Sequence, residues 1–164
     1  MKKKHVSAQT PAIAWLLQRD IPFKTHVYKY KNHGGAGHAA AALGLDLHYI
    51  AKTLVMENEL GQPLIVLMHG SHEVSLKQLA RQTGHRSITP CTPRDAQRHS
   101  GYLVGGTSPF ATRKPMPVWA QDSLLALPEI HINGGQRGLL LTISSAVLTD
   151  ELHAQPVQAA LTVD

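Results

Sequence analysis

Hydrophobic and polar positions along the first thirty residues follow a helical period and then change to a strand period. Residues 11–19 have apolar side chains at every third or fourth position and begin at Thr10-Pro11, a pair suited to the first turn of a helix. Residues 23–30 alternate with a period of two, which is typical of a strand. The pattern therefore predicts a helix over 11–19, followed by a strand.

Two continuous apolar runs in the middle of the chain predict the central strands. Residues 50–57 and 64–68 are separated by a polar segment that contains glycine and proline, so we expect a hairpin. Capping residues and helix-ending glycines predict helices over 37–43 and 75–82, and from Thr92-Pro93 to about His99. Further strands are predicted at 101–104, which lead into a glycine-rich bend, and at 118–119, 129–132 and 139–143.

These elements predict an α+β fold, with one mixed β-sheet or partial barrel of about seven strands flanked by short helices. The helices are too few and too short for repeated parallel crossovers. With 164 residues, of which 43% are apolar, the chain has the size of one domain. We expect a basic tail over 1–9, a single domain over 10–155 and a C-terminal tail over 156–164.

Composition narrows the class of partner and the compartment. The net charge of +5 favours anionic partners, although three lysines lie in the N-terminal tail, where they could simply be solvated. A single cysteine, Cys91, excludes an internal disulfide and is typical of a reducing compartment. The longest apolar run, 64–68, is far too short for a membrane span. We expect a cytoplasmic protein that does not bind membranes.

Two features could carry chemistry. Gly105-Gly106 follows an apolar segment, and successive glycines can direct backbone N–H groups at a phosphate, a carboxylate or a developing oxyanion. The same pair could equally form a plain tight turn. Lys52 lies in a mostly apolar strand, where its ammonium must either reach water or serve a buried anion, and residue pattern alone leaves both open.

Other chemistry has less support. Cys91 lies in a loop whose only positive neighbours in the sequence are Arg86 and Arg94, so we do not expect a nucleophilic cysteine. His69 with His72, and His33 with His38, have spacings that could hold a metal ion, but no carboxylate or His-Glu-x-x-His pattern accompanies either pair. Surface or core histidines are the expected interpretation, and the sequence predicts no metal site.

Three blocks of the sequence together resemble a known family. Ala51-Lys52-Thr53-Leu54-Val55, the segment 101–109 (GYLVGGTSP) and the segment 134–139 (GGQRGL) follow the order and spacing of the YbaK/EbsC/ProXp family of aminoacyl-tRNA editing domains. The resemblance extends from about residue 10 to about residue 150.

The resemblance implies hydrolysis of the ester that joins a wrong amino acid to the terminal adenosine of a tRNA, typically a tRNA for proline. It implies no metal and no organic cofactor. By position in the motifs, Lys52, Gly105 and Gly106 would be catalytic, and the substrate would be bound by Tyr28, Thr53, Thr107, Ser108, Pro109 and Leu140. Aminoacyl-tRNA would be the partner, DNA is not expected, and a synthetase partner is left open.

One position departs from the family pattern. Leu140 stands where Cys-specific members resemble one another in carrying an Asp, so specificity for Cys-tRNA does not follow. Leu140 could line a pocket or could be core. A non-catalytic module that binds aminoacyl-tRNA or another nucleotide is the alternative to an enzyme, and an assay with mischarged tRNA separates the two.

Overall fold

The computed structural model describes residues 9–161, and the predicted basic tail lies almost wholly outside this range. The first helix, α1 (Pro11–Gln18), begins as the sequence predicts. Thr10 Oγ1 accepts a hydrogen bond from the Ile13 N–H at 3.2 Å, and the same hydroxyl donates to the Gly134 carbonyl at 2.5 Å. The residue that caps α1 therefore also connects the helix to the segment that contains Gly134.

The remaining elements include all the predicted helices. Thr92 and Ser75 cap their helices, and Gly44 and Gly84 end theirs in the left-handed conformation, as the capping pattern predicts. In chain order the elements are β1 (Lys24–Val27), α2 (Gly35–Leu43), η2 (Leu47–Tyr49), β2 (Ile50–Asn58), β3 (Pro63–His69), β4 (Glu73–Val74), α3 (Leu76–Thr83), β5 (Ile88–Pro90), α4 (Pro93–Ser100), β6 (Val118–Gln121), α5 (Asp122–Leu125), β7 (Glu129–Asn133), β8 (Leu139–Ser144), α6 (Ala146–Asp150), β9 (Gln155–Val157) and β10 (Ala160–Leu161).

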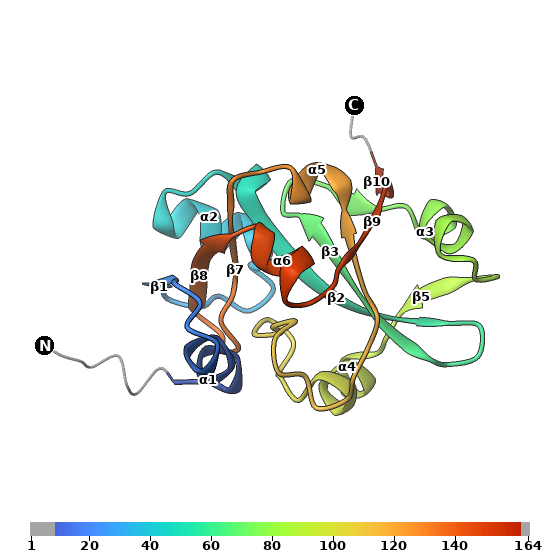
Figure 1. Cartoon of the computed structure of the whole chain (residues 1–164). Helices are drawn as coiled ribbons and strands as arrows, with labels where there is room; N and C mark the ends of the chain where they lie inside the picture. The colour runs from blue at the N-terminus through green and yellow to red at the C-terminus, as the bar shows by residue number, and fades with distance from the viewer. Residues whose placement is uncertain (1–8, 162–164) are drawn as a thin grey trace, which may run out of the picture.

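One mixed sheet organises the molecule, which confirms the predicted α+β class. Its order is β1-β8-β7-β2-β3-β6-β9, with β5 also paired to β2, while β10 and β4 form a separate pair. The β2–β3 hairpin is antiparallel, as predicted, whereas β2–β7, β3–β6 and β6–β9 are parallel. Figure 1 shows α2 at the β1 and β8 end of the molecule and α3 at the opposite end, near β5.

Strand β2 has an interrupted edge. β3 pairs along one edge of β2 from Ala51 to Glu57. On the other edge, β7 pairs only with Ile50 and Ala51, and β5 only from Met56 onward. Residues 52–54 thus have no main-chain partner on that edge among the described residues, whereas the Val55 carbonyl accepts from the Cys91 N–H at 3.1 Å. The candidate site forms at this gap.

The two faces of the central hairpin pack in separate cores. In β3, Ile65 and Leu67 belong to the cluster that contains α1, whereas Leu64, Val66 and Met68 pack with α3. This period of two is what a strand buried on both faces requires. In the first cluster Phe110 is fully buried and stacks on Trp15, with ring centroids 5.1 Å apart.

Two predictions about elements were wrong. No strand forms over 101–104: Gly101 ends α4, and Leu103 and Val104 are exposed, so three apolar residues between glycines find no partner strand. The predicted tail from residue 156 instead contains most of β9, which pairs with β6, and β10, which pairs with β4. None of the helices in the described part of the chain has the length and apolar character that a membrane crossing requires.

Candidate functional site

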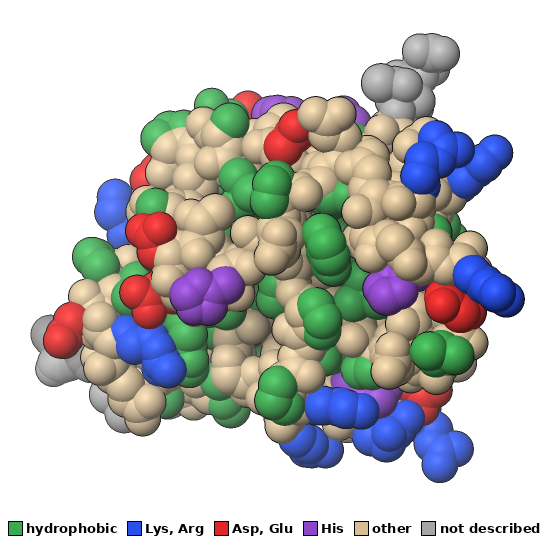
Figure 2. Space-filling model, turned by 45° about the vertical axis from the view of Figure 1, so that its right-hand side comes forward, with side chains coloured by type: hydrophobic (Ala, Val, Ile, Leu, Met, Phe, Trp, Pro, Cys, Tyr) green, Lys and Arg blue, Asp and Glu red, His purple; other side chains and the backbone are tan. Residues whose placement is uncertain are grey.

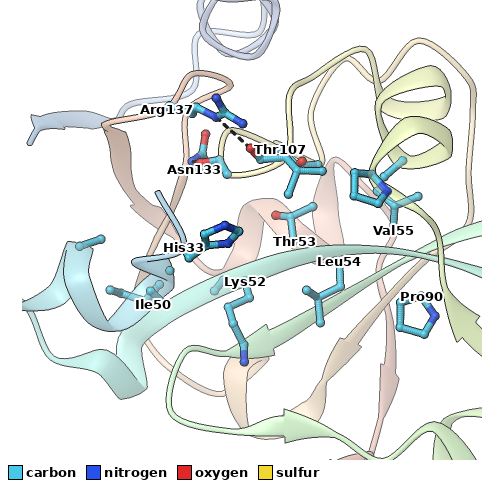
Figure 3. A pocket seen from close by; sticks show the side chains of 18 of the residues that line it. His33, Ile50, Lys52, Thr53, Leu54, Val55, Pro90, Thr107, Asn133 and Arg137 are labelled. Atoms are coloured by element: carbon cyan, nitrogen blue, oxygen red, sulfur yellow. Dashed lines mark hydrogen bonds between the residues drawn. The ribbon is translucent and has the colours of Figure 1, made fainter. Parts of the chain in front are cut away.

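A cavity of about 920 Å³ lies along the unpaired edge of β2. Residues 50–56 of β2 form its floor, α2 and the segment before it form one wall, and α4 with the loop around Gly105 forms another. Because the strand has no neighbour on this edge, the cavity reaches side chains from both faces of β2. Figure 3 shows Thr53 and Val55 on one side of the strand, and Lys52 and Leu54 on the other.

Thr53 presents three unused polar groups at the gap. Its hydroxyl is buried and has no hydrogen-bond partner among the described residues. The Asn58 N–H donates to Gln62 and the Gly70 N–H donates to Ile50, so even-numbered residues of β2 direct their main chain toward β3. The N–H and C=O of Thr53 therefore point to the unpaired edge. A buried polar group without a partner is costly, which makes Thr53 a strong candidate for ligand contact.

The glycine turn supplies further donors, but not from both glycines. Gly105 has φ +94° and lines the cavity, as does Thr107. Within the described chain, neither the Gly105 N–H nor the Thr107 N–H donates to a protein acceptor. The Gly106 N–H donates to the Leu103 carbonyl at 2.8 Å, so it is already used within the turn. Of the two glycines, only Gly105 offers a free donor to the cavity.

The end of the motif lies outside the lining of the cavity. Ser108 is fully buried, and its hydroxyl accepts from the Phe110 N–H at 3.1 Å. Neither Ser108, Pro109 nor Gly106 lines the cavity. A Cβ on Gly106 would lie 2.8 Å from the Arg137 nitrogen, so this glycine allows the turn to approach the 136–137 backbone. These three residues shape the site without reaching its interior.

Lys52 lies at the other end of the cavity from the glycine turn. Its ammonium donates to the His72 carbonyl at 2.5 Å, and the side chain points away from Thr53 and Thr107 (Figure 3). Burial lowers the pKa of Lys52 below its ordinary value, and the nearby Glu73 partly opposes this. An ammonium has three donors, so a half-buried Lys52 retains two for an anion in the cavity.

Arg137 and Asn133 line the cavity although the sequence predicted no role for either side chain. Arg137 donates through Nε to the Val104 carbonyl at 2.9 Å, and its guanidinium lies 5.0 Å from the centre of the Tyr30 ring. Asn133 donates to the Gly105 carbonyl at 3.0 Å, so it joins the end of β7 to the turn. Arg137 belongs to the third sequence block and Asn133 immediately precedes it, and their polar side chains beside three glycines were the available signal.

Tyr28 and Leu140 form the apolar wall. Leu140 packs with Ala39, Ile50 and Tyr28 while also lining the cavity, so the pocket and core interpretations are both correct for this residue. Its neighbours Leu139 and Leu141 point into the opposite core, as strand alternation predicts. Burial, followed by the nearby Tyr30, raises the pKa of Tyr28.

The cysteine and histidine candidates have other partners. Burial raises the pKa of the Cys91 thiol to about 11, and Glu57 adds to the effect, so the reactive thiolate is scarce at neutral pH. Both ring nitrogens of His69 are hydrogen-bonded, Nδ1 to the His48 carbonyl at 2.6 Å and Nε2 to Ser123 Oγ at 2.7 Å. In the described part of the chain, no three His, Cys, Asp or Glu side chains gather as a metal site would require.

Comparison with known proteins supports the resemblance seen in the sequence. The model of the aminoacyl-tRNA editing domain family matches residues 34–151, a range that includes Thr53, the glycine turn and Leu140. EbsC of Enterococcus faecalis, named as a candidate Cys-tRNA(Pro)/Cys-tRNA(Cys) deacylase, is 26% identical over 156 residues, which cover 94% of this chain and 95% of EbsC.

Proline–tRNA ligases and solved structures extend the comparison. The ligase of Stenotrophomonas maltophilia is 28% identical over 105 residues, covering 62% of this chain but only 18% of the ligase. The crystal structure of a candidate trans-editing enzyme for prolyl tRNA synthetase has a TM-score of 0.79 at 24% identity, and covers 94% of this chain and 99% of its own. A hypothetical protein of known structure reaches a TM-score of 0.84 at 21% identity, with coverage of 93% and 100%. At these identities the structures show a shared fold.

Proposed function

This chain belongs to the aminoacyl-tRNA editing domain family, and from that membership we propose that it is a deacylase that acts in trans and hydrolyses the ester of a misacylated tRNA. EbsC matches it along almost its whole length, whereas the proline–tRNA ligases match it only as a part of a larger chain. This relationship supports an editing domain that acts in trans. A role in translation and the single cysteine support a cytoplasmic location.

The unpartnered Thr53 hydroxyl is the observation that carries the proposal. It lies with the free N–H groups of Gly105 and Thr107 at one end of a cavity that is otherwise mostly apolar. An ester that enters this end would meet donors for its carbonyl oxygen and a hydroxyl able to position water. An ester is already activated, so oriented donors and a held water can supply much of the rate.

The reaction then proceeds without a covalent enzyme intermediate. The water oxygen forms a bond to the ester carbonyl carbon, and negative charge moves to the carbonyl oxygen beside the N–H groups of Gly105 and Thr107. Collapse of this tetrahedral intermediate breaks the bond to the ribose oxygen, which takes the proton that the attacking water loses. The products are the free amino acid and the uncharged tRNA. The high pKa of Cys91 disfavours an alternative thiolate attack.

Cations at the two ends of the cavity suit the anionic part of the same substrate. Lys52 lies at one end, and Arg137 lies beside the glycine turn at the other. A terminal nucleotide carries both the aminoacyl ester and a phosphate, so it would use a hydroxyl-lined end and a cationic end together. We assign the phosphate to Lys52, which is partly desolvated and would gain from an anion.

We propose a tRNA for proline that carries a small wrong amino acid as the substrate. The names of EbsC and of the prolyl-tRNA trans-editing structure support the tRNA, and the apolar wall supports the size of the acid. Leu140, Ile50 and Ala39 offer no carboxylate to an amino-acid side chain. Such a wall discriminates by size, and one methylene in a hydrophobic pocket is worth only about 1–3 kcal/mol.

Hydrolysis of a panel of tRNA(Pro) species charged with Ala, Ser, Thr, Cys or Pro tests the proposal. We expect release of at least one small acid, little release of proline, and a fall of roughly tenfold or more in the Thr53→Val variant. A folded protein that binds these tRNAs but releases none of the acids would contradict the deacylase and favour a binding module.

A further inference from the structure

A second feature of the molecule, outside the cavity, is a basic surface built by α4 and the segment 113–114. Arg94 and Arg98 are exposed on α4, and Arg113 and Lys114 are exposed on the segment. We call these four side chains the α4 face. Figure 2 shows Lys and Arg side chains gathered along the bottom of the molecule, the side on which Figure 1 places α4.

Hydrogen bonds make the two segments one surface. The Arg113 N–H donates to the Ser100 carbonyl and the Lys114 N–H to the His99 carbonyl, each at 3.0 Å. These carbonyls lie in the last turn of α4, so the bonds fix the segment against the helix end. Arg98 and Lys114 both lower the pKa of the buried His99, after burial itself, so both charges lie near this ring.

Few carboxylates balance these cations. Asp95 pairs with Arg98 at 3.1 Å, and Glu57 on β2 lies near Cys91 and His99. No ion pair is formed by Arg94, Arg113 or Lys114 with any described residue. Three exposed cations without partners on one face form an electrostatic site for a polyanion.

The α4 face is continuous with the cavity. Pro93 and Ala96 of the same helix line the cavity, while Arg94 lies between them in sequence. A helix of 8 residues is about 12 Å long. A tRNA whose ester lies at Thr53 and whose last phosphate lies at Lys52 would have to turn at the mouth of the cavity to pass α4. After that turn its acceptor stem would meet Arg94 first and the segment 113–114 at the far end of the helix.

Helix α3 also carries exposed cations, but it is a weaker candidate for binding a polyanion. Lys77 and Arg81 are exposed on α3, which also adjoins the cavity through Leu76. However, Glu73 lies just before α3, and Glu59 accepts a hydrogen bond from the Arg86 N–H at 3.1 Å. Carboxylates therefore offset more of the positive charge around α3 than on the α4 face.

We propose that the α4 face binds backbone phosphates of the tRNA acceptor stem and so orients the 3′ end toward the cavity. This inference rests on the proposed function, because the substrate has to be a tRNA whose last nucleotide enters the cavity. Phosphate contacts give affinity and orientation without reading the sequence. The α4 face would therefore act on binding of the whole tRNA and not on the ester.

A triple variant, Arg94→Gln with Arg113→Gln and Lys114→Gln, tests the proposal on two substrates. With full-length misacylated tRNA we expect kcat/KM to fall by about tenfold or more, mainly through KM, and the slope of log K against log salt to decrease by about 2–3. With the same acid esterified to the trinucleotide CCA we expect no change. Lys77→Gln with Arg81→Gln is the matched control and should leave both substrates within about twofold of wild type.

The following results would contradict the proposal that the α4 face binds tRNA. Unchanged activity and salt dependence on full-length tRNA would exclude it, and an equal loss on both substrates would assign the effect to the cavity. Binding of uncharged tRNA, measured in parallel, separates this inference from the proposed function. A protein that binds tRNA through the α4 face but hydrolyses neither substrate would contradict only the deacylase, whereas wild-type binding by the triple variant would contradict the face.

Discussion

Lys52 and Thr53 are neighbours on β2, yet their side chains lie at opposite ends of the cavity. The Lys52 ammonium donates to the His72 carbonyl, while the Thr53 hydroxyl is buried without a partner on the other side of the strand. This arrangement is possible because the strand has an unpaired edge between β7 and β5. The two residues should consequently have different kinetic effects.

Thr53→Val should reduce kcat, because it removes a hydroxyl at the proposed position of the ester while preserving the shape of the side chain. We expect a loss of roughly tenfold or more. Stability should stay constant or rise by about 1 kcal/mol, because an unsatisfied buried hydroxyl is removed. Steady-state rates beside thermal melts measure both quantities. A stability loss as large as the activity loss would show that Thr53 is only structural.

Lys52→Met should instead raise KM, because a phosphate contact holds the ground state and the transition state alike. We expect kcat/KM to fall by an amount that corresponds to about 2–4 kcal/mol of lost transition-state stabilisation, if the cavity desolvates the phosphate. Steady-state assays of Thr53→Val and Lys52→Met on the same substrate compare their effects on kcat and KM. Near-wild-type hydrolysis by a folded Lys52→Met protein would remove Lys52 from the site.

Gly106→Ala should lose stability and activity together. The added methyl group would lie 2.8 Å from the Arg137 nitrogen and 3.0 Å from the Gln136 carbonyl carbon, so the two loops must separate. Such overpacking costs about 1–3 kcal/mol. Gly37→Ala in α2 is the control, because nothing lies within 4 Å of its added Cβ and alanine favours a helix. Activity loss in Gly106→Ala without any change in thermal stability would indicate a direct contact with substrate.

Leu140→Asp should shift the preference of the enzyme toward Cys-tRNA. The wild-type wall offers no carboxylate to orient a thiol or an amine, so we expect a graded preference among small acids with no unique preference for cysteine. Leu140→Asn is the control for size and polarity. Ratios of kcat/KM between Cys-tRNA and Ala-tRNA are the measurement, since a ratio is insensitive to a loss of folded protein. A wild-type enzyme that strongly prefers Cys-tRNA would refute this prediction.

Stability should decrease as the pH falls below about 6.5, the ordinary pKa of histidine. Burial, the largest cause in each case, lowers the pKa values of His69, His99 and His131 in the folded protein. The unfolded chain then binds more protons than the folded one, and stability is lost as the pH falls through the unfolded value toward the folded one.

His69→Gln should flatten this pH dependence, because one buried group that resists protonation is removed. Free energies of unfolding at pH 7.5 and pH 5.5 give the slope for wild type and variant. The exposed His153 has φ +56°, which asparagine tolerates, so His153→Asn is a matched control for the loss of one histidine. An unchanged slope in His69→Gln would exclude the buried ring as a source of acid sensitivity.

Local signals predicted the parts of the fold that local interactions determine. The caps at Thr10, Ser75 and Thr92 and the two apolar runs of the hairpin all have their physical cause within a few residues of chain. By contrast, β9 and β10 are short strands that exist only because β6 and β4 are present to pair with them. The segment 101–104 shows the reverse case, where strand-like residues lack a partner.

The sequence predicted only part of the site, because the rest depends on contacts between distant segments. Lys52, Thr53, Gly105, Thr107 and Leu140 line one cavity, as the motif blocks indicate. Which face of β2 each side chain uses, and which N–H groups are already bonded, depend on contacts between distant segments. The Gly106 N–H and the buried Ser108 hydroxyl are used within their own loop, and that could not be deduced from their place in a motif.

The unpaired stretch of β2 also explains how the molecule can carry an open sheet edge without inviting a second protein chain. Unpaired edges are templates for intermolecular strand pairing. Here the open interval is only residues 52–54, roughly 10 Å of strand, because the Val55 carbonyl accepts from the Cys91 N–H, and β7 and β5 close the interval at both ends. A strand from another molecule would collide with these neighbours before it formed a ladder, whereas the slender end of a nucleic acid could enter.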